Sequence, residues 1–144
     1  MWPTDSNGLM EMKTIFPVKS DRQSILSFYI QRSIHIHVQV HTDWTMRKNG
    51  TITTGNVVSI GQLYFDEALE KKIMALEPYA SHTQINRTTN AEDSVFPYDT
   101  AGGFSPIINV IPVDGHDITK GMIGYVTLGI NTTAIERGDN YVGD

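Results

Sequence analysis

YIQRSIHIHVQVH, residues 29–41, is the stretch that decides the fold. From residue 33 onward its side chains alternate between apolar and polar. The apolar set is Ile34, Ile36, Val38 and Val40. The polar set is His35, His37, Gln39 and His41. A period of two places successive side chains on opposite faces of a strand. The stretch therefore predicts a strand with one face in a core and a second face rich in histidine.

The histidine-rich face has the spacing of a metal site. Alternate residues of a strand lie about 6.6 Å apart, so the imidazoles of His35 and His37 can converge on one small ion. Tyr29, a potential phenolate donor, and Arg32, a fixed positive charge, precede them. Imidazole with phenolate suits iron better than calcium or magnesium, which prefer oxygen ligands. A His-x-His pair also occurs on solvated strand faces, and the pattern alone leaves that interpretation open.

The pattern YxxRxIHIH, residues 29–37, resembles the ligand strand of intradiol ring-cleavage dioxygenases, in particular their fungal extracellular branch. In that family two tyrosines and two histidines hold a ferric ion. The resemblance implies that His35 and His37 are the histidine ligands. It implies that Tyr29 is the tyrosinate that leaves the metal when a catechol binds, and that Arg32 lies beside the substrate ring.

Five further segments resemble the same family. One of them, IGQLYF at 60–65, contains Gln62, which the resemblance places beside the substrate. The others are TDSNG at 4–8, TIFP at 14–17, TNAEDSVF at 89–96 and GMIGYVTLGIN at 121–131. Most of the chain is covered, but it matches only the second half of a family member. The resemblance implies a β-sandwich with the ferric site at its edge.

The sequence departs from the family in two places. The family's first tyrosine ligand lies upstream of the segment matched by residues 4–8, and no residue here matches it. Between Pro17 and Tyr29, the stretch from Val18 to Phe28 is longer than the corresponding link in the fungal relatives. We expect one partial domain over residues 1–144, with 18–28 as an insert. Our hypothesis is a retained intron and a start codon placed too far downstream; mature message encoding the insert would refute it.

Composition excludes several classes of function. The 144 residues carry a net charge of −5 without a basic patch, which argues against nucleic acid as a partner. The absence of cysteine excludes disulfides and thiolate metal sites. No apolar run reaches membrane-spanning length, and none near Met1 resembles a secretory signal. Three glycosylation sequons, at Asn49, Asn86 and Asn131, nevertheless fit a secreted protein.

The remaining pattern predicts a mainly-β fold with one short helix. The further strands are expected at 10–15, 57–65, 107–113 and 122–130, the last two joined by an Asp-Gly turn at 114–117. Asp66 has the character of an N-cap, and apolar residues on one face favour a helix from Asp66 to Leu76. Residues 42–55 and 96–103 are expected to be loops, with one helical turn starting at 90–93. These elements indicate a β-sandwich, incomplete at one edge.

Other polar residues are weaker candidates for metal or substrate binding. His41 continues the histidine-rich face but matches no family ligand. Tyr64 would replace the missing tyrosinate only if its face meets the metal. Glu92 and Asp93 are potential oxygen ligands that the pattern assigns to the start of a helix. Arg32 has the alternative of pairing with a surface carboxylate.

We therefore expect a non-haem iron(III) dioxygenase that cleaves a catechol-type diol between its hydroxylated carbons, with dioxygen as the second substrate. The alternative is a non-catalytic, truncated β-sandwich with weak or no metal binding, whose incomplete edge favours association. A third interpretation, a cupin-like site that adds Glu67 and His116 to the His-x-His pair, ranks last because neither residue lies in a strand-like context.

Overall fold

The computed structural model describes residues 3–14, 16, 31–53, 55–81, 83 and 86–135. Tyr29 and the whole predicted insert, Val18 to Phe28, lie outside these ranges. The elements in chain order are β1 (His35–His41), β2 (Thr45–Met46), β3 (Ile52–Thr53), β4 (Val57–Tyr64), α1 (Glu67–Met74), the 3-10 turn η1 (Tyr79–Ser81), α2 (Phe96–Thr100), β5 (Asn109–Pro112), the 3-10 turn η2 (Ile118–Lys120) and β6 (Met122–Tyr125). The prediction of a mainly-β fold is confirmed.

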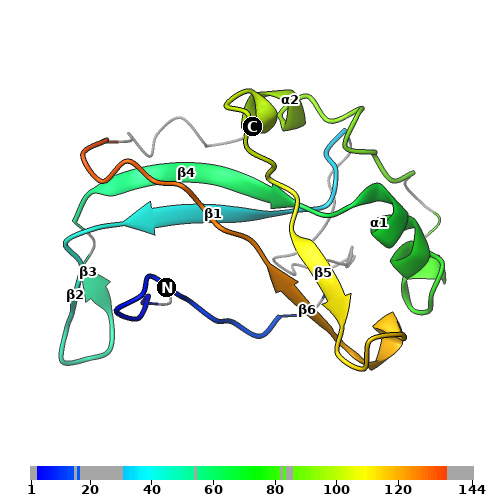
Figure 1. The fold of residues 1–144 in the computed structure, drawn as a ribbon, viewed down its shortest axis with the longest axis horizontal. Helices are drawn as coiled ribbons and strands as arrows, with labels where there is room; N and C mark the ends of the chain where they lie inside the picture. Colours follow the sequence, from blue (N-terminus) through cyan, green and yellow to red (C-terminus); the bar gives the residue numbers. More distant parts are fainter. Residues whose placement is uncertain are drawn as a thin grey trace.

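Strands β1 and β4 form the longest ribbon, with the β2–β3 hairpin at one end and α1 beyond the other (Figure 1). They pair antiparallel, with His35 opposite Tyr64 and His37 opposite Gln62. Directly opposed residues of an antiparallel pair project from the same face of the sheet. The two predicted strands are therefore confirmed, and their pairing brings the histidines and the IGQLYF segment together on one face.

The apolar face and the ends of this ribbon contribute to a small core. Ile34, Phe65 and Ile108 are buried together. Ile36 and Leu63, on the face of the ribbon away from the histidines, pack against this cluster. The alternation read from residues 33–41 thus separates a packed face from a polar one, as a period of two requires.

The segment leading into the β5–β6 hairpin is hydrogen-bonded to the end of β4. The Tyr64 amide donates to the Pro106 carbonyl at 2.9 Å, and the Ile108 amide donates to the Tyr64 carbonyl at 2.8 Å. Both strands are shorter than predicted, and residues 126–130 form no strand. The expected Asp-Gly turn is present, with Gly115 at a φ of 81°, but η2 lengthens the connection.

Helix α1 begins where its cap was predicted. The Asp66 carboxylate accepts from the amides of Ala68 and Leu69, and the helix ends at Met74, two residues before the predicted end. The other local predictions were wrong in part. Residues 42–55 contain the β2–β3 hairpin, residues 96–100 form α2 instead of a loop, and residues 10–14 form no strand. None of the described helices is long and apolar enough to span a membrane.

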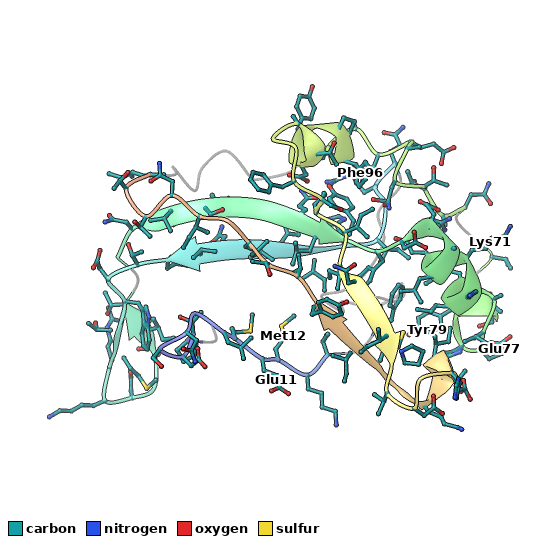
Figure 2. All side chains as sticks on the ribbon, viewed as in Figure 1. Glu11, Met12, Lys71, Glu77, Tyr79 and Phe96 are labelled. Carbon is teal, nitrogen blue, oxygen red and sulfur yellow. The ribbon has the colours of Figure 1, made fainter. Side chains whose placement is uncertain are left out.

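Side chains from separate segments close the core on two sides of the ribbon's end. Phe96, at the start of α2, packs edge-on against Tyr64 with ring centroids 4.9 Å apart. On the other side, Phe16 lies 4.5 Å from Phe65 and 6.3 Å from Tyr79 between centroids. Figure 2 shows Phe96 above the ribbon and Tyr79 below α1. Aromatic side chains from three separate segments therefore pack around the end of the ribbon.

Candidate metal and substrate site

Two histidines of β1 converge on one point. The Nε2 atoms of His35 and His37 lie 3.1 Å apart, with the rings 4.8 Å apart between centroids. The Nδ1 atom of His35 lies 2.7 Å from the Ser33 carbonyl oxygen. Since a carbonyl only accepts, Nδ1 carries the proton and Nε2 carries the lone pair. This is the tautomer a metal-binding histidine needs, held by a backbone group.

The electrostatics of the pair favour neutral imidazoles. Burial lowers the pKa of both rings below the ordinary value, and the nearby positive charge of Arg32 adds to the effect. Neutral imidazoles are ligands for iron, zinc and copper. The two side chains therefore fit the histidine half of the ferric site that the resemblance implies. Within the described ranges, no further His, Cys, Asp or Glu completes a group of three metal ligands.

Arg32 and Gln62 lie beside this pair. Gln62 is buried opposite His37 on β4, and its Oε1 accepts a hydrogen bond from Nη2 of Arg32. Nε of Arg32 donates to the Asp93 carboxylate at 3.1 Å. The structure thus brings Arg32, His35, His37 and Gln62 together. Tyr29, the fifth predicted site residue, lies outside the described part of the chain, and its role stays a prediction.

Tyr64 does reach the histidine face, although it is not placed as a tyrosinate. Its ring centroid lies 5.9 Å from that of His35. Its hydroxyl donates to Asp99 Oδ2 at 2.7 Å and lies 3.0 Å from Gln62 Oε1. Burial, reinforced by the hydrogen bond to the negative Asp99, raises the pKa of Tyr64 far above its ordinary range. Tyr64 is therefore a neutral phenol whose hydroxyl proton points to Asp99 and whose oxygen lies next to the Gln62 amide.

Two carboxylates have roles at the site that the sequence did not indicate, since the pattern marks Asp93 only as a potential oxygen ligand or a helix-start residue and does not mark Asp99. Asp93 is buried and accepts hydrogen bonds from Ser33 and Arg32, on the segment leading into β1. Asp99, on α2, accepts from Tyr64. Asp93 stands in a polar stretch without a period and Asp99 in an expected loop, so neither carries a local signal of burial. Only the family-like segment 89–96 pointed to the region.

The remaining candidates lie apart from the pair. His41, whose side chain is half-buried, ends β1, four residues beyond His37. His116 lies in the β5–β6 turn, where its amide donates to Asp114. Glu67 pairs with Arg87 at 2.6 Å. The cupin-like grouping of Glu67 and His116 with the His-x-His pair is therefore not assembled among the residues that the structure describes.

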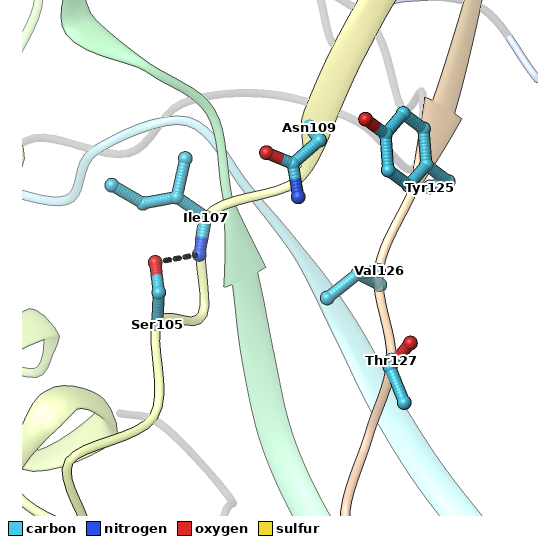
Figure 3. A pocket seen from close by; sticks show the side chains of 6 residues that line it. All are labelled: Ser105, Ile107, Asn109, Tyr125, Val126 and Thr127. Carbon is cyan, nitrogen blue, oxygen red and sulfur yellow. Dashed lines mark hydrogen bonds between the residues drawn. The ribbon is translucent and has the colours of Figure 1, made fainter.

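A shallow pocket of about 370 Å³ lies between the approach to β5 and the end of β6 (Figure 3). It is lined by Ser105, Ile107, Asn109, Tyr125, Val126 and Thr127. One wall is shaped by the Ile107 amide, which donates to Ser105 Oγ at 3.3 Å. None of the predicted site residues lines this pocket.

The sequence matches no protein-family profile and no curated protein. Solved structures do match it. One is an intradiol ring-cleavage dioxygenase from Tetranychus urticae, with 29% identity over 77% of this chain and a TM-score of 0.58. A second solved dioxygenase shares 29% identity over 77% of this chain, with a TM-score of 0.59. The chain spans 46% of each solved chain, about half its length. The fungal branch stays a prediction. In fold and in sequence, the chain is similar to intradiol ring-cleavage dioxygenases.

Proposed function

We propose that this chain forms the histidine-bearing half of a non-haem iron(III) dioxygenase that cleaves a catechol-type diol with dioxygen between its hydroxylated carbons. The observation that carries the proposal is the convergence of His35 and His37 at 3.1 Å, with the tautomer of His35 set by Ser33. Similarity to intradiol dioxygenases supports the same assignment.

The residues of the site divide into those that hold the cofactor and those that face the substrate. His35 and His37 would hold the ferric ion, with Tyr29 proposed as an anionic ligand on the strength of the sequence motif. When bound, the ion would supply a Lewis acid that withdraws electron density from the diol. Arg32 places a permanent positive charge beside the ring position, where it stabilises negative charge that develops on the substrate.

Gln62 is the second residue that would contact the substrate. Its Oε1 accepts a hydrogen bond from Nη2 of Arg32, which fixes the rotation of the amide. The amide nitrogen is then left to donate to a substrate oxygen. Tyr29, as a phenolate, is proposed to take a proton from the diol and so become a neutral phenol, as the resemblance implies.

A second candidate function is a non-catalytic family member with weak metal binding. The observation that favours it is that two histidines, without a third His, Cys, Asp or Glu, form the donor set in the described part of the chain. Two imidazoles without an anionic ligand bind several divalent metals without strong selectivity. The two candidates differ in whether the loaded chain turns over a diol.

Product analysis under isotopically labelled dioxygen separates the two candidates. If the dioxygenase proposal is correct, the ferric-loaded chain converts catechol to a ring-opened diacid that carries both labelled oxygen atoms. His35→Ala should abolish the conversion, while His116→Ala, in the distant β5–β6 turn, should leave it unchanged. Unlabelled product, or none from a chain that retains iron, would exclude the proposal.

We also propose that the protein is secreted. All three sequon asparagines, Asn49, Asn86 and Asn131, are exposed and thus accessible to glycosylation. Expression in a eukaryotic secretory host should yield a chain whose mass falls on glycosidase treatment. Unmodified sequons in that host would count against the proposal.

A further inference from the structure

A buried carboxylate lies behind the histidine pair. The Asp93 side chain has no exposed surface, and its Oδ2 accepts from the Ser33 amide at 2.7 Å and the Ser33 hydroxyl at 3.0 Å. Its Oδ1 accepts from the Val95 amide at 2.8 Å and the Phe96 amide at 3.3 Å. Nε of Arg32 donates between the two oxygens, at 3.2 and 3.1 Å. A carboxylate has about four lone-pair sites, so Asp93 has none to spare for a metal ion.

These donors keep Asp93 ionised despite its burial. Burial alone would raise its pKa, but hydrogen bonds from the Ser33 and Val95 amides and from the Ser33 hydroxyl, together with Arg32, hold the pKa below its ordinary value. A charged group out of water is tolerated only when it is paired and hydrogen-bonded. Asp93 is thus a fixed negative charge that holds neighbouring groups in place by hydrogen bonds.

The first group set by Asp93 is the Arg32 guanidinium. Its Nε is bound to Asp93, and its Nη2 donates to Oε1 of Gln62. The guanidinium is planar and rigid, so anchoring Nε fixes the direction of the other nitrogens. Gln62 lies opposite His37 in the ribbon. Asp93 therefore determines how the guanidinium of Arg32 is oriented toward Gln62 and the histidine pair.

The second group is the backbone that selects the tautomer of His35. Asp93 binds both the amide and the hydroxyl of Ser33. The carbonyl of the same residue accepts the Nδ1 proton of His35 at 2.7 Å. Holding Ser33 in place keeps that carbonyl aligned with the imidazole. The effect reaches the metal-binding atom, Nε2, through the tautomer.

We propose that Asp93 is a positioning residue of this site, which aims Arg32 at the substrate position and holds Ser33 so that His35 presents Nε2 to the metal. The inference rests on the proposed function, because it assigns the two aimed groups to substrate and metal. Asp93 itself touches neither.

The first test compares Asp93→Asn with a matched control, Asp114→Asn. Asp114 also accepts from two backbone amides, those of His116 and Asp117, and also pairs with a cation, Lys120. In a nitrogen-15-labelled chain, Asp93→Asn should speed solvent exchange at the Nε–H of Arg32 and mix the His35 tautomers. Asp114→Asn should leave both signals as in the wild type. Unchanged Arg32 and His35 signals in Asp93→Asn would overturn the proposal.

The second test is a double-mutant cycle on catechol turnover. Removing an outer partner of this kind lowers activity by about 10–100-fold, and we expect Asp93→Asn to reduce kcat/KM within that range. Because Asp93 acts in part through Arg32, the double variant with Arg32→Gln should lose less than the product of the single losses. Fully multiplicative losses, which a general structural role would give, would overturn the proposal.

Two outcomes need separate readouts. If Asp93→Asn does not fold, Arg32→Lys replaces it: lysine keeps the charge but lacks the fork that joins Asp93 to Gln62. Loss of kcat/KM comparable to Arg32→Gln would support the proposal, and full activity would overturn it. If the wild-type chain does not cleave catechol, the proposed function fails. The exchange rate at Arg32 Nε–H still tests the positioning role: faster exchange in Asp93→Asn than in the wild type supports it, and an equal rate overturns it.

Discussion

At the scale of single residues, the site is a set of buried and half-buried polar groups that form hydrogen bonds with one another. Asp93 anchors Arg32, Arg32 donates to Gln62, and the Tyr64 hydroxyl, which lies beside Gln62, donates to Asp99. A buried polar group without a partner is costly, so each member depends on its neighbours. Such a network fixes the side chains around the histidine pair before any ligand binds.

Removing one hydroxyl from this network should be measurable in stability. Tyr64→Phe removes the hydrogen bond between the buried Tyr64 and the half-buried Asp99, and we expect a loss of stability of about 1 kcal/mol. Tyr98→Phe is the matched control, since Tyr98 is 80% exposed, and a surface change of this kind alters stability by about 0.5 kcal/mol or less. Urea unfolding of both variants measures the difference. Equal stability losses would contradict the network described here.

At the scale of elements, the sequence predicts long periodic segments well and short ones poorly. The alternation in residues 33–41 and the cap at Asp66 located β1 and α1 because each signal is local. Strands β2 and β3 have two residues each, too few for a period. Helix α2 has five residues and no side-chain cap from Val95; the Phe96 amide donates instead to the Asp93 carboxylate at 3.3 Å. Contacts from distant residues decide such elements.

Helix α1 is joined to the segment after it through one shared cation. Arg87 donates to Glu67 and to Glu70, each at 2.6 Å, and the Glu70 side chain has no exposed surface. Burial raises the pKa of Glu70 from 4.5 to about 8, with Arg87 opposing the shift and the charge of Glu67 adding to it. Glu70 therefore binds its proton more tightly in the folded chain than in the unfolded one.

This shift makes stability depend on pH. Because the folded-state pKa is raised, the contribution of Glu70 is fully present below pH 4.5 and is lost as the pH rises through about 8. One group changes the free energy of unfolding by at most about 1.4 kcal/mol per pH unit. Unfolding measured from pH 5 to 9 should show a flatter profile for Glu70→Gln. Glu77→Gln, at an exposed position, should follow the wild type; a Glu70→Gln profile parallel to wild type would contradict the account.

At the scale of the whole molecule, the sequence predicted the strands that carry the candidate site but not the distant residues, such as Asp93, that hold its side chains in place. The motif at 29–37 placed Arg32, His35 and His37, and the segment 60–65 placed Gln62 on the partner strand. Asp93 is 60 residues from Ser33 in sequence. A contact of that separation leaves no local pattern, so it emerges only from the folded chain.

The hairpin of β5 and β6 exposes a set of large apolar side chains. They are Ile111, Val113, Ile123 and Tyr125, with exposed fractions of 49%, 62%, 52% and 56%. Exposed apolar clusters on edge strands promote pairing with other chains. We expect concentration-dependent association in analytical ultracentrifugation, reduced by Ile123→Lys and unaffected by Ala68→Lys on the exposed side of α1. A chain that stays monomeric at high concentration would contradict this expectation.

The central claim is that His35 and His37, with Tyr29, form an iron site that accepts a diol. The most direct test is the visible absorption spectrum of the ferric-loaded chain, recorded before and after anaerobic addition of catechol. The account predicts a tyrosinate-to-iron band that shifts with catechol, changes in Tyr29→Phe and is absent from His35→Ala, which should not retain iron. A colourless ferric-loaded chain, or a band that catechol leaves unchanged, would contradict it.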